Sequence, residues 1–286
     1  MNISAPQHKG ELANNYIGIL IIFTNFAFIL YKLLQHMKLN KFLFIYLLAT
    51  SVVSCSHKTW TITQATSIKI PIDSNAEGLA DRHYEAFLEP LKQKIDAEMN
   101  VTIGQAAETM KGYAPESLLS NFCADVYRQT ATDFLGQKVD ISIVNLGGLR
   151  TVVTSGNITI GKVFELMPFE NELVIVWLKG DKLRDLLEYF ASMGGEGVSG
   201  LHMEIQQGKA VNVTIEGKPL DTEKLYTIAT NDYLASGNDK MIQLAQYEKQ
   251  INTGIKVRNM LLDKIKLETK KGNKIQSKLD GRISIQ

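Results

Sequence analysis

The chain of 286 residues has few cysteines and no excess of charge of one sign. Only Cys55 and Cys123 are present, which excludes a fold held together by a disulfide framework. Residues 55–286 contain 27 basic and 29 acidic residues. This near balance, without a basic stripe, argues against a nucleic-acid partner, because binding a phosphate backbone requires clustered Lys and Arg.

Histidine is also scarce, since residues 55–286 contain only His57, His83 and His202. Asp81-Arg82-His83 spells Asp-x-His, but no Asn-His or His-x-His sequence accompanies it. Zinc-type sites need three or four converging ligands, so we interpret Asp81-Arg82-His83 as part of a solvated helix face. No Gly-x-Ser-x-Gly sequence occurs either. We therefore predict no metal site and no catalytic residue in this chain.

Residues 37–54 have the pattern of a signal peptide. Met37–Lys41 is positively charged, Phe42–Val53 is apolar, and small or β-branched residues precede Cys55. The segment resembles a bacterial lipoprotein signal, in which Cys55 becomes the lipidated first residue and anchors the protein in the cell envelope. The alternative is an uncleaved membrane helix, although the apolar run is shorter than the ~20 residues that span a bilayer.

Residues 1–36 have two interpretations. Tyr16–Tyr31 is a second apolar stretch, so the segment is either an over-extended start or an extra membrane segment. Residues 55–64 are expected to form a tether, and residues 65–286 to form one domain without repeats or low-complexity linkers.

Within this domain, hydrophobic periodicity predicts α+β architecture with a mixed sheet flanked by helices. Ser74-Asn75-Ala76-Glu77 resembles a capping box that begins a helix. We expect helices at about 74–99, 116–134, 162–166, 182–191 and 256–267. We expect strands at about 61–72, 101–107, 139–144, 172–178, 201–205, 211–215, 225–230 and 282–285.

Two glycine-containing loops, Asn145–Arg150 and Asn231–Asp239, each follow a predicted strand. Glycines such as Gly147, Gly148 and Gly237 let the backbone approach a ligand closely, and the neighbouring Asn, Arg, Tyr and Asp offer hydrogen bonds, charge and a stacking face. We predict a small-molecule binding site at these strand ends.

Several segments together resemble the C-terminal domain of 5'-nucleotidases, in order and spacing. They are Glu116–Asp125, Asn145–Arg150, Leu166–Phe169, Leu178–Gly180 and Asn231–Asp239, with Ile70–Asp73 and Asp280–Ile283 at the edges. Each motif alone is weak, but five in register are specific. The resemblance covers about residues 65–286.

The resemblance implies a role for each matching residue. Phe169 and Tyr233 match two aromatic residues that sandwich a base, and Asp239 matches the carboxylate that accepts the ribose hydroxyls. Asn145 matches an amide near the base, and Arg150 matches a phosphate-facing arginine. These residue types suit the chemistry, because aromatic rings stack on any base and Arg pairs with phosphate oxygens.

The chain also departs from the family pattern. The family has a further arginine in the stretch occupied here by Gly112–Pro115, where none is present, so we expect a weaker grip on phosphate. The family's Gly-Gly-Asp-Gly is replaced by Gly237-Asn238-Asp239-Lys240. We expect Asn238 to keep the turn through a positive φ, and Lys240 to restore some positive charge.

Ordinary structural roles are alternatives for the same residues. Phe169 and Tyr233 can be packing residues, and Asp239 can cap a helix that begins near Met241. The metal ligands of the family's phosphoesterase half are missing from this sequence.

Three functional hypotheses follow. The first is the nucleoside- or nucleotide-recognition half of a split 5'-nucleotidase, whose divalent metals are held by a separate metallophosphoesterase chain. The others are a stand-alone nucleoside-binding lipoprotein and a relic that serves protein interaction. We favour the first, because both aromatic residues, the carboxylate and the arginine remain.

Overall fold

A computed structural model of the chain describes residues 27–28, 30–32, 66–67, 69 and 81–286. The predicted signal peptide at 37–54, the lipidation site Cys55 and the capping box at 74–77 lie outside these residues. Thr66, Ser67 and Lys69 are the described members of the strand expected at 61–72, and they belong to no strand, because none of the described strands pairs with them. Within the described ranges, no helix has both the length and the apolar character needed to cross a bilayer.

A mixed sheet of five strands forms the centre of the structure, in the order β10-β4-β9-β2-β5. Its strands are β2 (Ile141–Val144), β4 (Glu172–Lys179), β5 (Gly197–Ser199), β9 (Leu225–Asn231) and β10 (Lys249–Lys256). β2 and β9 are parallel, and the other neighbours are antiparallel. The predicted α+β architecture with a mixed sheet is confirmed.

Two smaller sheets complete the described part of the domain. One has the order β11-β6-β7-β8, and the other pairs β1 with β3. Their strands are β1 (Thr102–Ala106), β3 (Gly156–Thr159), β6 (Leu201–Gln206), β7 (Lys209–Ile215), β8 (Lys218–Pro219) and β11 (Ile283–Ile285).

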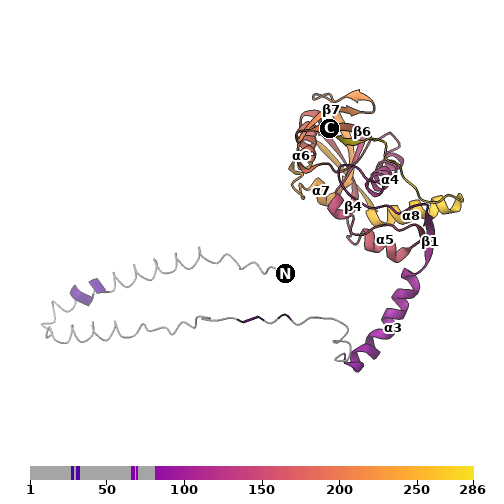
Figure 1. The fold of residues 1–286 in the computed structure, drawn as a ribbon. Helices are drawn as coiled ribbons and strands as arrows, with labels where there is room; N and C mark the ends of the chain where they lie inside the picture. Colours follow the sequence, from indigo (N-terminus) through magenta and orange to yellow (C-terminus); the bar gives the residue numbers. More distant parts are fainter. Residues whose placement is uncertain (1–26, 29, 33–65, 68, 70–80) are drawn as a thin grey trace. The chain divides into compact units, whose positions relative to one another are not determined.

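Helices cover both faces of the central sheet, as Figure 1 shows. The helices are α3 (Arg82–Met99), α4 (Leu118–Leu135), α5 (Ile160–Leu166), α6 (Gly180–Met193), α7 (Asp232–Ala235) and α8 (Val257–Lys270), with the 3₁₀ turns η2 (Leu146–Gly148) and η3 (Ile242–Gln246). α4 and α8 share one hydrophobic core with the sheet. α6 and the β6–β7 hairpin share another.

The strand β4 explains why there are two cores. Its side chains alternate, with Leu173 and Ile175 in the α4/α8 core and Val174, Val176 and Leu178 in the α6 core. Burial on both faces is what a nearly continuous apolar strand requires. The buried Cys123, which burial gives a pKa of about 12, packs on the α4 side as an inert apolar residue.

Four strand ends meet at one edge of the central sheet, and this edge positions the site. Since β2 and β9 are parallel, both end there, at Val144 and Asn231. The antiparallel β4 begins beside the end of β9, with Leu173 opposite Asn231. β10 ends at the same edge, with Lys256 opposite Glu172. The loops that leave or enter these four strands are therefore neighbours in space.

Some predicted boundaries differ from the structure. The described long helix begins at Arg82, because Asp81 has an extended backbone and caps the helix by accepting a hydrogen bond from the His83 amide; the start expected near residue 74 lies outside the described residues. β2 begins at Ile141 instead of 139, because the Val139 amide donates to the hydroxyl of Thr132. The strands β3, β5, β8 and β10 were not predicted.

The helix α3 carries an exposed apolar stripe. In Figure 1 it leads away from the two-stranded sheet of β1 and β3, and β1 follows it in the chain. None of its residues is buried. Tyr84, Phe87, Leu88, Leu91 and Ile95 are each more than half exposed. Their spacing places them on one face of the helix.

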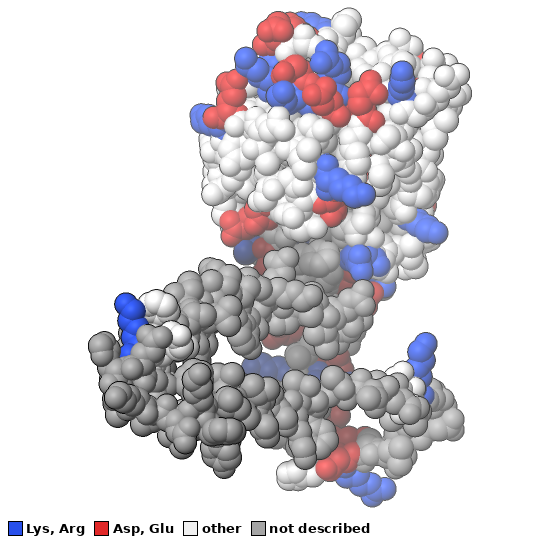
Figure 2. Space-filling view, turned by 90° about the vertical axis from the view of Figure 1, so that its left-hand side faces the viewer, with Lys and Arg blue, Asp and Glu red and all other residues white. Residues whose placement is uncertain are grey.

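Basic and acidic side chains are mixed on the face of the domain in Figure 2. Among the described residues on this face, no continuous basic strip is visible. Opposite charges also form ion pairs, as between Lys256 and Glu172 and between Lys224 and Asp140.

Candidate functional site

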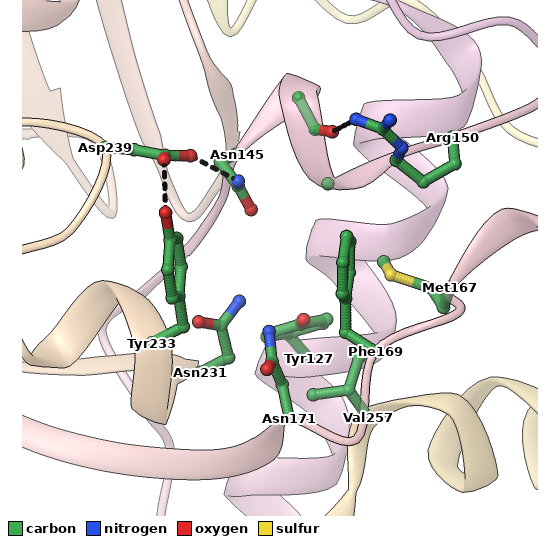
Figure 3. Close-up of a pocket in the computed structure, with 12 residues that line it drawn as sticks. Tyr127, Asn145, Arg150, Met167, Phe169, Asn171, Asn231, Tyr233, Asp239 and Val257 are labelled. Carbon is green, nitrogen blue, oxygen red and sulfur yellow. Dashed lines mark hydrogen bonds between the residues drawn. The ribbon is translucent and has the colours of Figure 1, made fainter. Parts of the chain in front are cut away.

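A pocket of about 350 Å³ opens at the edge where the four strand ends meet. Phe169 and Tyr233 form opposite walls, and Figure 3 shows their rings facing each other across the space. Phe169 precedes β4 and Tyr233 lies in α7, directly after β9. Their side chains are 48% and 42% exposed, so neither fills the core. The arrangement suits a flat aromatic ligand inserted between two rings.

Asp239 lies at one end of the pocket and is held by its neighbours. Its Oδ2 accepts a 2.6 Å hydrogen bond from the Asn145 amide, and its Oδ1 accepts a 2.8 Å bond from the Tyr233 hydroxyl. The Tyr189 hydroxyl donates to the backbone oxygen of Asp239 at 3.0 Å. Each carboxylate oxygen keeps a further lone pair. The group can therefore accept hydrogen bonds from a ligand without giving up those it already has.

Asp239 does not cap a helix, which removes the alternative role considered for it. The 3₁₀ turn η3 begins at Ile242 with Met241 as its N-cap residue, and the carboxylate of Asp239 accepts from Asn145 and Tyr233 instead. Asp239 instead has a positive φ of 53°. This left-handed backbone accompanies the contacts of its side chain with Tyr233 and Asn145.

The loop after β2 brings Asn145, Gly147, Gly148 and Arg150 to the pocket. Residues Leu146–Gly148 form the turn η2, which returns the chain across the end of the strand. Gly148 is buried against the Asn145 side chain, and a Cβ at this position would lie 2.7 Å from Asn145 Oδ1. No atom lies within 4 Å of a Cβ built at Gly147. Of these two glycines, only Gly148 therefore has to be a glycine, because its backbone lies too close to the Asn145 side chain for a Cβ.

Arg150 stands at the other end of the pocket, across from Asp239 in Figure 3. Its Nη1 donates to the backbone oxygen of Gly147 at 3.2 Å, and the side chain is otherwise exposed. A guanidinium has five N–H donors. Several donors of Arg150 therefore remain for an anionic group of a ligand.

The floor of the pocket contains residues that the sequence did not single out. Tyr127, Asn171, Asn231, Met167 and Val257 also line it. Figure 3 places Tyr127, Asn171 and Asn231 below and between the two rings. The Asn231 Oδ1 caps α7 by accepting from the Leu234 amide. Burial raises the pKa of Tyr127, so its hydroxyl stays protonated and can donate a hydrogen bond.

Glu196 is a partly buried acid that binds the loop after β2. Its Oε2 accepts a 2.8 Å hydrogen bond from the amide of Leu146, the first residue of η2. Burial, with a smaller contribution from the negative charge of Asp239, raises the pKa of Glu196 to about 7. The hydrogen bond to Asp239 is the main reason that the pKa of Tyr233 is raised.

The residues that hold the loop around Asp239 in its shape differ from those that the sequence predicts. Asn238 does not adopt a positive φ; Gly237, Asp239 and Lys240 do, at 83°, 53° and 63°. The Asn238 amide instead donates to the Tyr233 backbone oxygen at 2.8 Å, which closes the turn. Gly237 and Lys240 are not among the residues that line the pocket.

Seven of the eight residues predicted to bind a ligand therefore line one pocket. They are Asn145, Gly147, Gly148, Arg150, Phe169, Tyr233 and Asp239. By contrast, in the part of the chain that the structure describes, no three His, Cys, Asp or Glu side chains are placed to hold a metal ion.

Comparison with known proteins identifies relatives. A family model described as the C-terminal domain of 5'-nucleotidase matches residues 97–246. The trifunctional nucleotide phosphoesterase protein YfkN of Bacillus subtilis is 26% identical over 237 residues, which are 75% of this chain and 16% of that protein. The 5'-nucleotidase of Vibrio parahaemolyticus is 26% identical over 187 residues, 62% of this chain and 32% of that protein. The chain spans a third or less of the length of these relatives.

Solved structures resemble the domain as well. The 5'-nucleotidase precursor of Thermus thermophilus has a TM-score of 0.62 and 28% identity, covering 72% of this chain and 43% of that one. The NAD nucleotidase NadN of Haemophilus influenzae has a TM-score of 0.53 and 21% identity over 72% of this chain and 41% of that one, which indicates a shared fold.

Proposed function

Because this chain belongs to the 5'-nucleotidase C-terminal domain family, we propose that its pocket binds a nucleoside or a nucleoside 5'-phosphate. The observation that carries the proposal is the pair of facing rings, Phe169 and Tyr233, with a carboxylate at one end of the space between them and an arginine at the other.

The two rings receive the base. Both are about half exposed and belong to different strand-end segments, so a flat heterocycle can enter from solvent and stack on both faces. Stacking of a base on an aromatic side chain contributes ~1–3 kcal/mol. The amides of Asn171 and Asn231 and the Tyr127 hydroxyl lie on the floor below the rings, where they can pair with polar atoms at a base edge.

Asp239 receives the ribose hydroxyls. A carboxylate accepts hydrogen bonds from two neighbouring hydroxyl groups, and the lone pairs left by Tyr233 and Asn145 are available for this. The Asn145 bond fixes the orientation of the carboxylate before a ligand arrives.

Arg150 faces the 5'-phosphate. Its guanidinium is exposed at the end of the pocket opposite Asp239 and can form charge-assisted hydrogen bonds with phosphate oxygens. No second arginine occupies Gly112–Pro115. Nucleotide binding therefore depends on Arg150 more than on a cluster of basic residues.

Hydrolysis requires a second protein in this proposal. The chain acts in nucleotide catabolism as the recognition half of a split 5'-nucleotidase, and a separate metallophosphoesterase chain holds the divalent metals. The apolar stripe of α3 supports a contact with such a chain, because exposed apolar stripes mark protein interaction surfaces. The family match begins within α3, at residue 97, so the stripe lies just before the matched residues.

A lipid on Cys55 would hold the protein at the cell envelope, facing the periplasm or the cell surface. This part of the proposal is supported by the signal-like pattern of residues 37–54 alone. Globomycin treatment of cells that express the full chain tests it, since blocking lipoprotein processing should leave a larger precursor.

Calorimetric titration tests ligand binding. We expect the purified chain to bind adenosine and AMP, and to bind ribose 5-phosphate much more weakly because it has no base to stack. Phe169→Ala should weaken adenosine binding about 10-fold or more. Equal binding of the base-free sugar phosphate would contradict the base sandwich.

Phosphate release tests the split enzyme. We expect no release from AMP when the purified chain is supplied with Mn²⁺ or Zn²⁺, and release once a single-domain metallophosphoesterase from the same cell is added. Hydrolysis by this chain alone would contradict the requirement for a partner. Binding of nucleosides with no hydrolysis by any such pair would favour a stand-alone nucleoside-binding lipoprotein.

A further inference from the structure

The backbone that carries Phe169 is bound by the start of α8. The segment Met167–Asn171 joins α5 to β4, and four of its five backbone oxygens accept hydrogen bonds from three consecutive residues, Lys256, Val257 and Arg258. These residues lie where β10 ends and α8 begins. The contact therefore joins positions that are almost 90 residues apart in the sequence.

Arg258 makes the largest share of this contact. Its Nη1 donates to the backbone oxygens of Met167 at 3.2 Å and Phe169 at 3.5 Å. Its Nη2 pairs with the Glu170 carboxylate. Its guanidinium carbon lies 4.0 Å from the centre of the Phe164 ring, a cation–π contact. Only 7% of the residue is exposed.

Two flanking bonds complete the contact. The Lys256 ammonium donates to the Glu170 backbone oxygen at 2.9 Å, and the Val257 amide donates to the Asn171 backbone oxygen at 2.9 Å. Both accepting oxygens belong to residues that follow Phe169 in the sequence. Of the three residues at the start of α8, Arg258 is the one that binds the backbone oxygens of Met167 and Phe169.

Phe169 is 48% exposed, so packing holds its ring less firmly than it holds the side chain of a core residue. A ring that stacks on a base must nevertheless keep its distance from the opposite wall, since a wider gap loses contact with one face of the base. A buried arginine is also costly unless its charge and donors are used. Among the described residues, Nη1 of Arg258 donates to the backbone at the pocket wall and Nη2 pairs with Glu170, whereas the buried Nε has no hydrogen-bond partner.

We propose that Arg258 is a positioning residue for base binding: it holds the Met167–Glu170 backbone so that the Phe169 ring stays at stacking distance from Tyr233. This inference rests on the proposed function, because it assumes a base between the two rings. Arg258 itself does not line the pocket and acts through Phe169.

A double-mutant cycle with adenosine tests this action. Arg258→Met keeps an unbranched side chain that reaches as far as the Nε of arginine, and it removes the donors. Glu170 is 67% exposed, so its carboxylate stays solvated when its partner is lost. We expect R258M to weaken adenosine binding about 10-fold in the wild-type background and less than about 2-fold in F169A, because the wall that Arg258 holds is then already gone. A purely structural role predicts the same loss in both backgrounds.

Three further variants serve as controls. Arg184→Met removes an exposed arginine on α6, paired only with the adjacent Asp185 at 3.7 Å, and should leave binding unchanged. Glu170→Gln weakens the ion pair but leaves the two backbone bonds of Arg258, so it should cost less than about 3-fold. Arg258→Lys keeps the charge in case R258M folds poorly, and it should lie between R258M and wild type. Far-UV circular dichroism and the thermal midpoint identify any variant that has lost its fold.

The results separate the inference from the proposed function. Equal losses from R258M in the wild-type and F169A backgrounds, while wild type binds adenosine, overturn the role of Arg258 and leave the base sandwich standing. No adenosine binding by the wild-type chain overturns both.

Discussion

The hydroxyl of Tyr233 donates a 2.8 Å hydrogen bond to Oδ1 of Asp239. This bond joins a wall of the pocket to the carboxylate that faces the ribose in our proposal. It spans only six positions of the chain, within the loop that follows β9. The proposed sites for the base and the sugar are thus joined by a hydrogen bond, and a substitution of either residue should change the position of the other side chain.

Replacing Tyr233 separates the ring from its hydroxyl. Tyr233→Phe keeps the stacking face and loses one hydrogen bond, so adenosine binding should weaken about 2–5-fold. Tyr233→Ala also loses the ring and should weaken it about 10-fold or more. Calorimetry on both variants checks the order. If Y233F binds as poorly as Y233A, the hydroxyl and not the ring dominates.

Two adjacent glycines offer a matched pair of variants. A Cβ at residue 148 would lie 2.7 Å from Asn145 Oδ1, whereas a Cβ at residue 147 meets no atom within 4 Å. Gly148→Ala should displace the Asn145 amide from Asp239 and weaken adenosine binding about 3–10-fold, while Gly147→Ala should bind within about 2-fold of wild type. Equal affinities of the two variants would show that the Asn145 to Asp239 bond does not matter for binding.

Removing the Arg150 side chain should weaken the binding of a nucleotide more than the binding of a nucleoside. We expect Arg150→Ala to weaken AMP binding about 10-fold or more and to change adenosine binding less than about 2-fold, because only AMP carries the phosphate. Parallel titrations with both ligands measure this difference. Similar losses for the two ligands would place the phosphate away from Arg150.

Glu196 should make stability depend on pH. Its pKa is raised from 4.5 to about 7 in the folded chain, so between these values the folded state holds a proton that the unfolded state has released. The stability from this proton is complete below about pH 4.5 and is lost as the pH rises through about 7. Glu196→Gln cannot ionise, so its unfolding free energy should fall less between pH 5 and pH 8, by on the order of 2 kcal/mol.

Urea unfolding of wild type and E196Q at both pH values measures this difference. Parallel pH dependence of the two proteins would mean that Glu196 titrates near its ordinary pKa. The glutamine side chain of E196Q would still accept the hydrogen bond from the Leu146 amide, so the comparison isolates the charge.

Lys240 carries a left-handed backbone, with a φ of 63°. This conformation costs a non-glycine residue roughly 1 kcal/mol. Lys240→Gly should therefore be more stable than Lys240→Ala by about 0.5–1 kcal/mol, and both variants lack the charge equally. Comparing their AMP affinities with that of wild type shows whether the ammonium contributes to phosphate binding. No difference in stability between the two variants would contradict the strained backbone.

The sequence predicted the central part of the fold because its patterns are strong. β4 is a nearly continuous apolar run, and α4 has apolar residues at helical spacing. The helix begins at Leu118 and not at the expected residue 116, because Ser117 is its N-cap. The edge strand β10 was missed because the five partly buried residues among the eight of Lys249–Lys256 follow no alternating pattern, and none is fully buried. β3 and β5 have only four and three residues, too few for periodicity to show.

The pocket could be predicted only in part from the sequence. Its loop residues stand beside glycines at strand ends, and the family resemblance assigned them roles. Tyr127 was hidden because it occupies an apolar position of a helix, where core packing is the ordinary role. Glu196 and Arg258 act through contacts with residues 50 and about 90 positions away. Such pairings depend on the strand order, which no local pattern discloses.

The parallel pairing of β2 with β9 has a consequence for the newly made chain. The two ring-bearing segments meet only after β9 has inserted between β2 and β4, and the Phe169 segment is secured only when the α8 start has been synthesised. A ligand that needs both rings therefore recognises the finished domain and no shorter precursor. During biosynthesis, nucleoside binding should therefore begin only when the domain is complete. Protection from proteases by adenosine should appear in one step, once the ribosome has released the last helix.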